Sequence, residues 1–187
     1  MKQQISRFIF NLKTKKYAKR QKKFMNYSDI HSILLLFESS LNEKNPYINS
    51  IVKQLENDGK RVTLCGFLDK KISGQLVLPD FYIIDRSKTN FFSEPKQDFV
   101  APLLEKKFDV VLDLTLNETL PLQHILMYAD APFKVGRKIA NCAMLDFMID
   151  IKTHETADEI GSSQYVSQIS YLWEQIIFYL KSIKSHI

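Results

Sequence analysis

Three unbroken apolar runs constrain the fold of this chain more than any other feature. They are "SILLLF" (Ser32–Phe37), "RVTLCGFL" (Arg61–Leu68) and "FDVVLDLTL" (Phe108–Leu116). A continuous apolar run is typical of a strand whose sheet is covered on both faces, whereas a half-exposed strand alternates apolar and polar residues. We therefore predict that these runs are neighbouring parallel strands at the centre of one sheet.

A helical pattern joins the first two runs. In "NPYINSIVKQLENDGK", Asn45 is a candidate N-cap, Pro46 suits the first turn and Gly59 suits the C-terminal end. A strand, a helix and a second strand with short joints form the parallel crossover unit. The pattern thus favours an α/β fold over an antiparallel one.

The rest of the chain continues the alternation of strands and helices. Shorter strands are predicted at 81–85, 132–137 and 145–151, and the last alternates apolar and polar residues as an edge strand does. Helices are predicted at 97–106, from Pro121 onward and at 164–183, with Pro102 limiting the first of them. The prediction is one three-layer, Rossmann-like α/β domain with a mostly parallel sheet of five or six strands and helices on both faces.

Charge divides the chain into two parts. Residues 1–28 hold nine Lys or Arg and no Asp or Glu, and the whole chain holds 26 basic and 21 acidic residues. Residues 29–187 are therefore mildly acidic, with a net charge of −4. We interpret the chain as a basic helical arm, residues 1–28, followed by a single α/β domain, residues 29–187.

The arm begins with an amphipathic helical pattern. Ile5, Phe8, Ile9 and Leu12 recur at helical spacing, and we expect the helix to continue with Tyr17 and end near Lys23. Three interpretations stay open: binding of nucleic-acid phosphates, insertion of the apolar stripe into an anionic membrane surface, or docking of the stripe on the body with the charges solvated. The candidate anion-binding residues of the arm are Arg7, Lys13, Lys15, Lys16, Lys19, Arg20, Lys22 and Lys23.

A second candidate site follows the strands. Ligands of open α/β sheets bind outside the carboxyl ends of the strands, and Asp113 comes near the end of such a run. The candidate crevice residues are Ser39, Ser40, Asp113, Asn117, Glu118 and Arg137, with Lys134 across from the acids. The same residues also fit structural roles, since an Asp at a strand end often caps the following turn and Ser or Asn often caps a helix.

Several function classes lack their motifs. No GxGxxG follows the first run, and GxxxxGK[ST], HExxH, GxSxG and zinc-type Cys/His spacings are missing, so we predict no cofactor and no metal. Cys65 and Cys142 are interpreted as reduced core residues, which fits a reducing compartment. With neither a spanning apolar segment nor a signal-peptide pattern, we expect a cytoplasmic protein, either free or peripheral to a membrane.

The order of the motifs resembles a known family. "VTLCGFLDKK", "LPDFY", "FDVVLDLTLNETLPLQHI", "FKVGR" and "DFMIDI", after a basic N-terminal helix, resemble an uncharacterised family of small bacterial proteins, a domain of unknown function. That resemblance implies a Rossmann-like core and no established activity. "FDVVLDL…ADAPFKVG" also resembles the N-terminal half of heptosyltransferase-type glycosyltransferases, although "FESSLN" replaces their Gly-Asp and their second half is missing, which implies a shared scaffold.

Two functions follow as hypotheses. The first is a non-catalytic cytoplasmic protein that binds an anionic partner, nucleic acid or a membrane surface, through residues 1–23. The second is an enzyme acting on a nucleotide or sugar-phosphate at the carboxyl ends of the strands.

Overall fold

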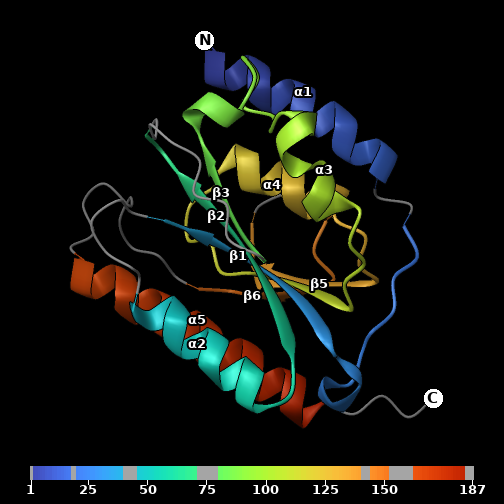
Figure 1. Ribbon diagram of the computed structural model, residues 1–187, viewed down its shortest axis with the longest axis vertical. Helices are drawn as coiled ribbons and strands as arrows, with labels where there is room; N and C mark the ends of the chain where they lie inside the picture. Colours follow the sequence, from blue (N-terminus) through green and yellow to red (C-terminus); the bar gives the residue numbers. More distant parts are fainter. Residues whose placement is uncertain are drawn as a thin grey trace.

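A computed structural model of the chain describes residues 2–17, 20–39, 46–70, 80–139, 144–151 and 162–183. A six-stranded sheet lies between two sets of helices (Figure 1). The helices α2 (Pro46–Asn57) and α5 (Ser162–Ser182) cover one face. On the other face lie α3 (Gln97–Leu104) and α4 (Leu120–Tyr128), with α1 (Lys2–Tyr17) outside them.

All strand pairs in the sheet are parallel, and the spatial order is β3-β2-β1-β4-β5-β6. The strands are β1 (Ser32–Glu38), β2 (Arg61–Leu68), β3 (Phe81–Asp85), β4 (Val110–Asp113), β5 (Phe133–Arg137) and β6 (Phe147–Ile149). The predicted parallel neighbours β2, β1 and β4 are central, and β6 is at an edge, so these predictions are confirmed. The described residues also form two 3-10 helices, η1 (Tyr27–Asp29) and η2 (Arg86–Lys88).

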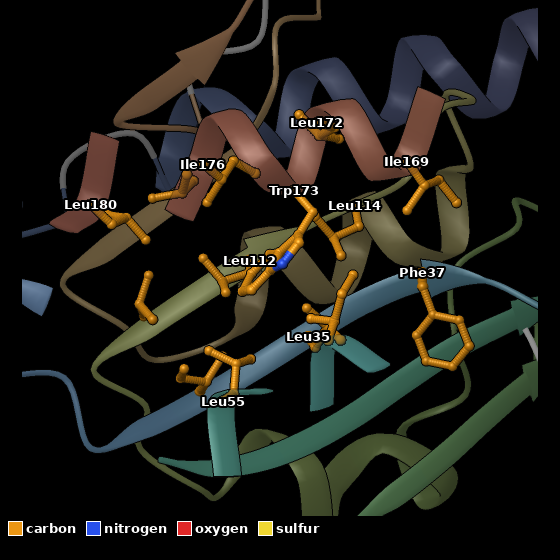
Figure 2. Close-up of a cluster of buried hydrophobic side chains, with 14 of the residues drawn as sticks. Leu35, Phe37, Leu55, Leu112, Leu114, Ile169, Leu172, Trp173, Ile176 and Leu180 are labelled. Atoms are coloured by element: carbon orange, nitrogen blue, oxygen red, sulfur yellow. The ribbon is translucent and has the colours of Figure 1, made fainter. Parts of the chain in front are cut away.

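The side chains of β1 explain its unbroken apolar sequence. Leu35 and Phe37 belong to the core beneath α2 and α5, whereas Leu34 and Leu36 belong to the core beneath α3 and α4. Figure 2 shows the first of these cores, in which α5 lies over the sheet with Trp173 at the centre. Burial on both faces leaves no position from Ile33 to Phe37 where a polar residue would meet water.

Helix α4 is buried around its whole circumference. Every residue from Pro121 to Met127 is buried, including the polar Gln123 and His124. Its outer side is covered by α1, whose Phe10 is buried and meets the His124 ring edge-on at 4.9 Å between centroids. Burial lowers the pKa of His124 to about 4. The imidazole therefore stays neutral beneath α1.

Two details of the predicted helices are wrong. In the described chain after α1, residues 20–26 are not helical, although the helix was expected to reach Lys23. Arg20 there donates to the carbonyl oxygens of Ala131 and Pro132 at 3.1 and 2.9 Å, and tertiary hydrogen bonds replace helical ones. Pro102 lies inside α3 rather than at its end. The neighbouring Leu103 is fully buried, and this packing holds the short helix together.

Candidate functional site

The order of the strands reverses between β1 and β4, and polar side chains gather there. Ligands of open α/β sheets bind at such a switch point, outside the carboxyl ends of the strands. We call the residues at this place the strand-end cluster: Glu38, Asp113, Thr115, Arg137 and Tyr165.

Glu38, the last residue of β1, is the hub of the strand-end cluster. Its carboxylate accepts hydrogen bonds from the backbone N–H groups of Leu116 and Asn117, at 3.3 and 3.1 Å. It also accepts from the hydroxyls of Thr119 at 3.2 Å and Tyr165 at 2.8 Å. Backbone N–H groups just before a helix are the groups that hold a phosphate in many α/β proteins. Here the chain's own carboxylate takes that place.

Asp113, the last residue of β4, is buried and caps a turn. One of its carboxylate oxygens accepts from the backbone N–H of Thr115 at 3.0 Å and from the Thr115 hydroxyl at 2.7 Å. Burial raises the pKa of Asp113 to about 6, against the lowering effect of the two Thr115 bonds. Gly136 of β5 lies opposite, and a Cβ there would come within 2.9 Å of the Asp113 backbone oxygen. The glycine is needed because Asp113 and β5 approach so closely.

The remaining crevice residues are dispersed. Asn117 contributes its backbone N–H to Glu38, and Glu118 instead pairs with Arg7 of α1. Ser39 donates its backbone N–H to Phe67 at 2.8 Å, whereas Ser40 lies outside the described residues. The charge of Arg137 lowers the pKa of Asp113, but this effect is smaller than those of burial, the Thr115 hydrogen bonds and the charge of Glu38.

Lys134 does not face the acids, so its predicted place across the crevice is wrong. Its ammonium is buried beneath α4 and donates to the carbonyl oxygens of Leu126 and Met127, at the C-terminal end of that helix. Burial lowers the pKa of Lys134 to about 8. The side chain caps the helix, since cations stabilise the negative end of the helix dipole.

Sequence reasoning missed Glu38 and Tyr165. The signal for Glu38 was its position, because it is an acid that directly ends an apolar run. Tyr165 carried no such signal, and burial followed by the charge of Glu38 raises the pKa of its phenol well above the usual range. The hydrogen bonds of Glu38 join β1, the entry of α4 and α5, whereas the buried Nε of Arg137 has no hydrogen-bond partner among the described residues.

Helix α1 turns its apolar stripe outward. Ile5, Phe8 and Leu12 are 44%, 63% and 53% exposed, and Ile9 is half-buried. We call Ile5, Phe8 and Leu12 the outer stripe. The helix docks through its opposite side, where Ser6 and Phe10 are buried, so the interpretation in which the stripe docks on the body, one of the three left open, is wrong.

Several arm cations pair with acids of the body instead of remaining solvated. Both carboxylate oxygens of Glu94 accept from the Lys13 ammonium at 2.7 Å, and one also accepts from the Tyr128 hydroxyl at 2.6 Å. Arg20 pairs with Asp146. Lys22 also reaches Asp146, at 3.3 Å.

The other predicted arm residues differ in what the structure describes. Lys15 and Lys23 are exposed, and Lys23 donates its backbone N–H to Pro132 at 3.0 Å. The side chain of Lys16 and all of Lys19 lie outside the described residues.

The described residues contain neither a metal-binding group of side chains nor a helix that could span a membrane. Among them, no group of three or more His, Cys, Asp or Glu side chains is arranged to hold a metal ion. Nor does any described helix have the length and apolar character needed to cross a membrane. Cys65 is a buried free thiol whose pKa is raised to about 12 by burial, and Cys142 lies outside the described residues.

The fold and the docked helix define a class: a parallel, Rossmann-like α/β protein that carries an amphipathic N-terminal helix on its α4 side. Within that class, the chain belongs to a family of unknown function, DUF6913, whose model matches residues 2–162. The matched range takes in α1 and all six strands. No curated protein and no solved structure matches the chain.

Proposed function

We propose that this protein attaches to anionic membrane surfaces through the outer stripe of α1. The observation that carries the proposal is the exposure of Ile5, Phe8 and Leu12 on a helix whose other side is already docked. Exposed apolar residues that follow one line on a helix mark an interaction site more often than scattered ones do. An amphipathic helix of this kind lies in the membrane plane with its apolar side ~5–10 Å deep in the headgroup region.

The charge of the chain complements an anionic bilayer. Residues 1–28 carry nine cations and no acid, whereas the remainder carries a net charge of −4. Each Lys or Arg held near anionic lipid contributes about 1 kcal/mol of attraction. The exposed Lys15 lies on the same helix as the outer stripe. Attraction between these cations and anionic lipid therefore turns α1 toward the membrane, and repulsion of the negatively charged body turns the body away from it.

Nucleic acid is the less favoured partner for the same residues. Binding to phosphates requires free cations and gains nothing from exposed aliphatic side chains. Nucleic-acid binding would leave the outer stripe in water, whereas a bilayer would bury it. The enzyme hypothesis is also less favoured, because Glu38 and Asp113 already have internal hydrogen-bond partners.

Vesicle co-sedimentation of the full chain tests the proposal. We expect binding to phosphatidylcholine vesicles that contain phosphatidylserine, much weaker binding without the anionic lipid, and loss of affinity with added salt. Replacing Phe8 and Leu12 together by Ser should weaken binding by ~100-fold, because each buried large apolar side chain contributes about 1.5 kcal/mol or more.

The matched control is Phe178→Ser. Phe178 is 60% exposed on α5, on the far side of the sheet from α1, and its loss should leave vesicle binding unchanged. Equal losses for the two variants would contradict the proposal. The wild-type chain could instead fail to bind vesicles and form a dimer that the Phe8 and Leu12 substitutions disrupt. That result would show that the outer stripe joins two copies of the chain, and it would overturn the proposal.

A further inference from the structure

We infer that the turn carrying Phe91 and Phe92 is a second insertion element that enters the same bilayer as α1, an inference that rests on the proposed function. The turn lies between η2 and α3 and places two adjacent aromatic residues at its tip. Phe91 is 63% exposed and Phe92 is 36% exposed, with their rings edge-to-face at 5.4 Å between centroids. Aromatic residues at the level of the lipid headgroups are typical of proteins that contact a bilayer.

Hydrogen bonds inside the turn fix its shape. The side-chain oxygen of Asn90 accepts from the backbone N–H groups of Phe92 at 2.9 Å and Glu94 at 3.1 Å. The Asn90 backbone N–H donates to the Glu94 carbonyl at 2.8 Å. Ser93 adopts the left-handed conformation, with φ of 61°, that lets the chain reverse. A turn closed in this way keeps Phe91 exposed and Phe92 partly exposed.

The turn and α1 are joined directly. Glu94, two residues after Phe92, is the acceptor for the Lys13 ammonium. Tyr17 of α1 also lines one cavity together with Glu94 and Pro95. In Figure 1 the green segment between β3 and α3 lies at the α1 end of the molecule. The aromatic tip and the outer stripe therefore belong to one end of the protein.

Charge near the turn favours the same surface. Lys96, which follows the turn, is exposed and donates its backbone N–H to Lys88 at 2.8 Å. An exposed cation that follows the aromatic turn in the chain suits anionic headgroups, whereas an apolar protein pocket would offer this lysine no partner. Two insertion elements held on one rigid body bind more tightly than either alone, because the second enters without a further loss of rotational freedom.

Replacing Phe91 and Phe92 by Ser in the full chain tests the inference. We expect affinity for phosphatidylserine-containing vesicles to fall by ~10-fold, with thermal unfolding unchanged because the turn's hydrogen bonds involve backbone atoms and Asn90. Suppose that the wild type binds vesicles and that the Phe8 and Leu12 substitutions weaken this binding. If the Phe91 and Phe92 variant then binds as tightly as the wild type, the inference about the aromatic turn is wrong and the proposed function stands. If the wild type itself does not bind, the proposed function fails with it.

Fluorescence locates the turn independently of affinity. The one native tryptophan, Trp173, is buried, so brominated lipids should not quench it. We expect Phe91→Trp to be quenched on vesicles and the matched Phe178→Trp to remain unquenched. An unquenched Phe91→Trp on vesicles that the protein binds would show that the turn stays in water and would overturn the inference.

Discussion

The strand-end cluster and the outer stripe are opposite kinds of surface. The strand-end cluster is polar and lies where folds of this class usually hold a ligand, yet Glu38 and Asp113 find their hydrogen-bond partners within the chain. The outer stripe is apolar, lies on a helix added to the fold, and exposes three large side chains. Position in the fold alone therefore does not locate function: the two acids of the strand-end cluster are satisfied internally, whereas the outer stripe exposes apolar area to water.

The sharpest test of this comparison sets the two sides of α1 against each other. Phe10→Ala removes a buried ring from the contact with His124 and should lower the free energy of α1 opening by about 3 kcal/mol. Phe8→Ala should change it by less than about 0.5 kcal/mol, because Phe8 faces water. Native-state hydrogen exchange of the α1 amides measures both. Equal effects would mean that the outer stripe is packed against protein in solution.

Breaking the strand-end cluster should have the next largest effect. Glu38→Ala leaves the backbone N–H groups of Leu116 and Asn117 and the hydroxyl of Tyr165 without their acceptor. We expect a loss of about 2 kcal/mol in the free energy of unfolding, measured by urea denaturation. Glu118→Ala is the control, since that carboxylate belongs to an exposed pair worth at most ~0.5 kcal/mol. A Glu38→Ala variant as stable as the control would show that the cluster is open to water.

A smaller effect, opposite in sign, is expected at Asp113. The folded-state pKa of about 6 lies above the unfolded value, so the stability that the protonated acid contributes is present below pH ~4 and lost as the pH rises through about 6. Asp113→Asn keeps an oxygen acceptor for Thr115 and removes the buried charge. The variant should therefore be more stable than wild type by roughly 1–2 kcal/mol at pH 7, and the gain should shrink toward pH 4.

Stability at pH 7 also distinguishes a structural carboxylate at Asp113 from a functional one. If Asp113→Asn is less stable than wild type at pH 7, the protein holds this carboxylate in its charged form against the effect of burial. A charged, buried carboxylate beside Arg137 would be the mark of a working site. The strand-end cluster would then regain its place as a candidate for ligand binding.

The apolar runs determined the sheet by themselves, because burial on both faces leaves a local trace in every residue of a strand. Leu34, Leu35 and Leu36 are apolar since consecutive side chains point into two different cores. The alternation over Leu145–Ile151 placed the strand that contains Phe147–Ile149 at the edge for the converse reason. The nearly continuous apolar sequence of α4 could also have indicated a helix covered on its outer side.

Only the tertiary structure decided which side of α1 docks. Helical spacing marks a stripe of like residues, but docking depends on partners far away in the chain, here Glu94, His124 and Tyr128. Those partners bind Lys13 and Phe10, and the outer stripe on the other side of α1 therefore faces water.

The role of Glu38 was hidden for the same reason. Its partners lie at the entry of α4 and on α5, about 80 and more than 120 residues further along the chain. The sequence gives the identity of each residue and the local pattern around it. That Glu38 takes the place of a ligand follows only from the meeting of β1, the entry of α4 and α5 in the folded protein.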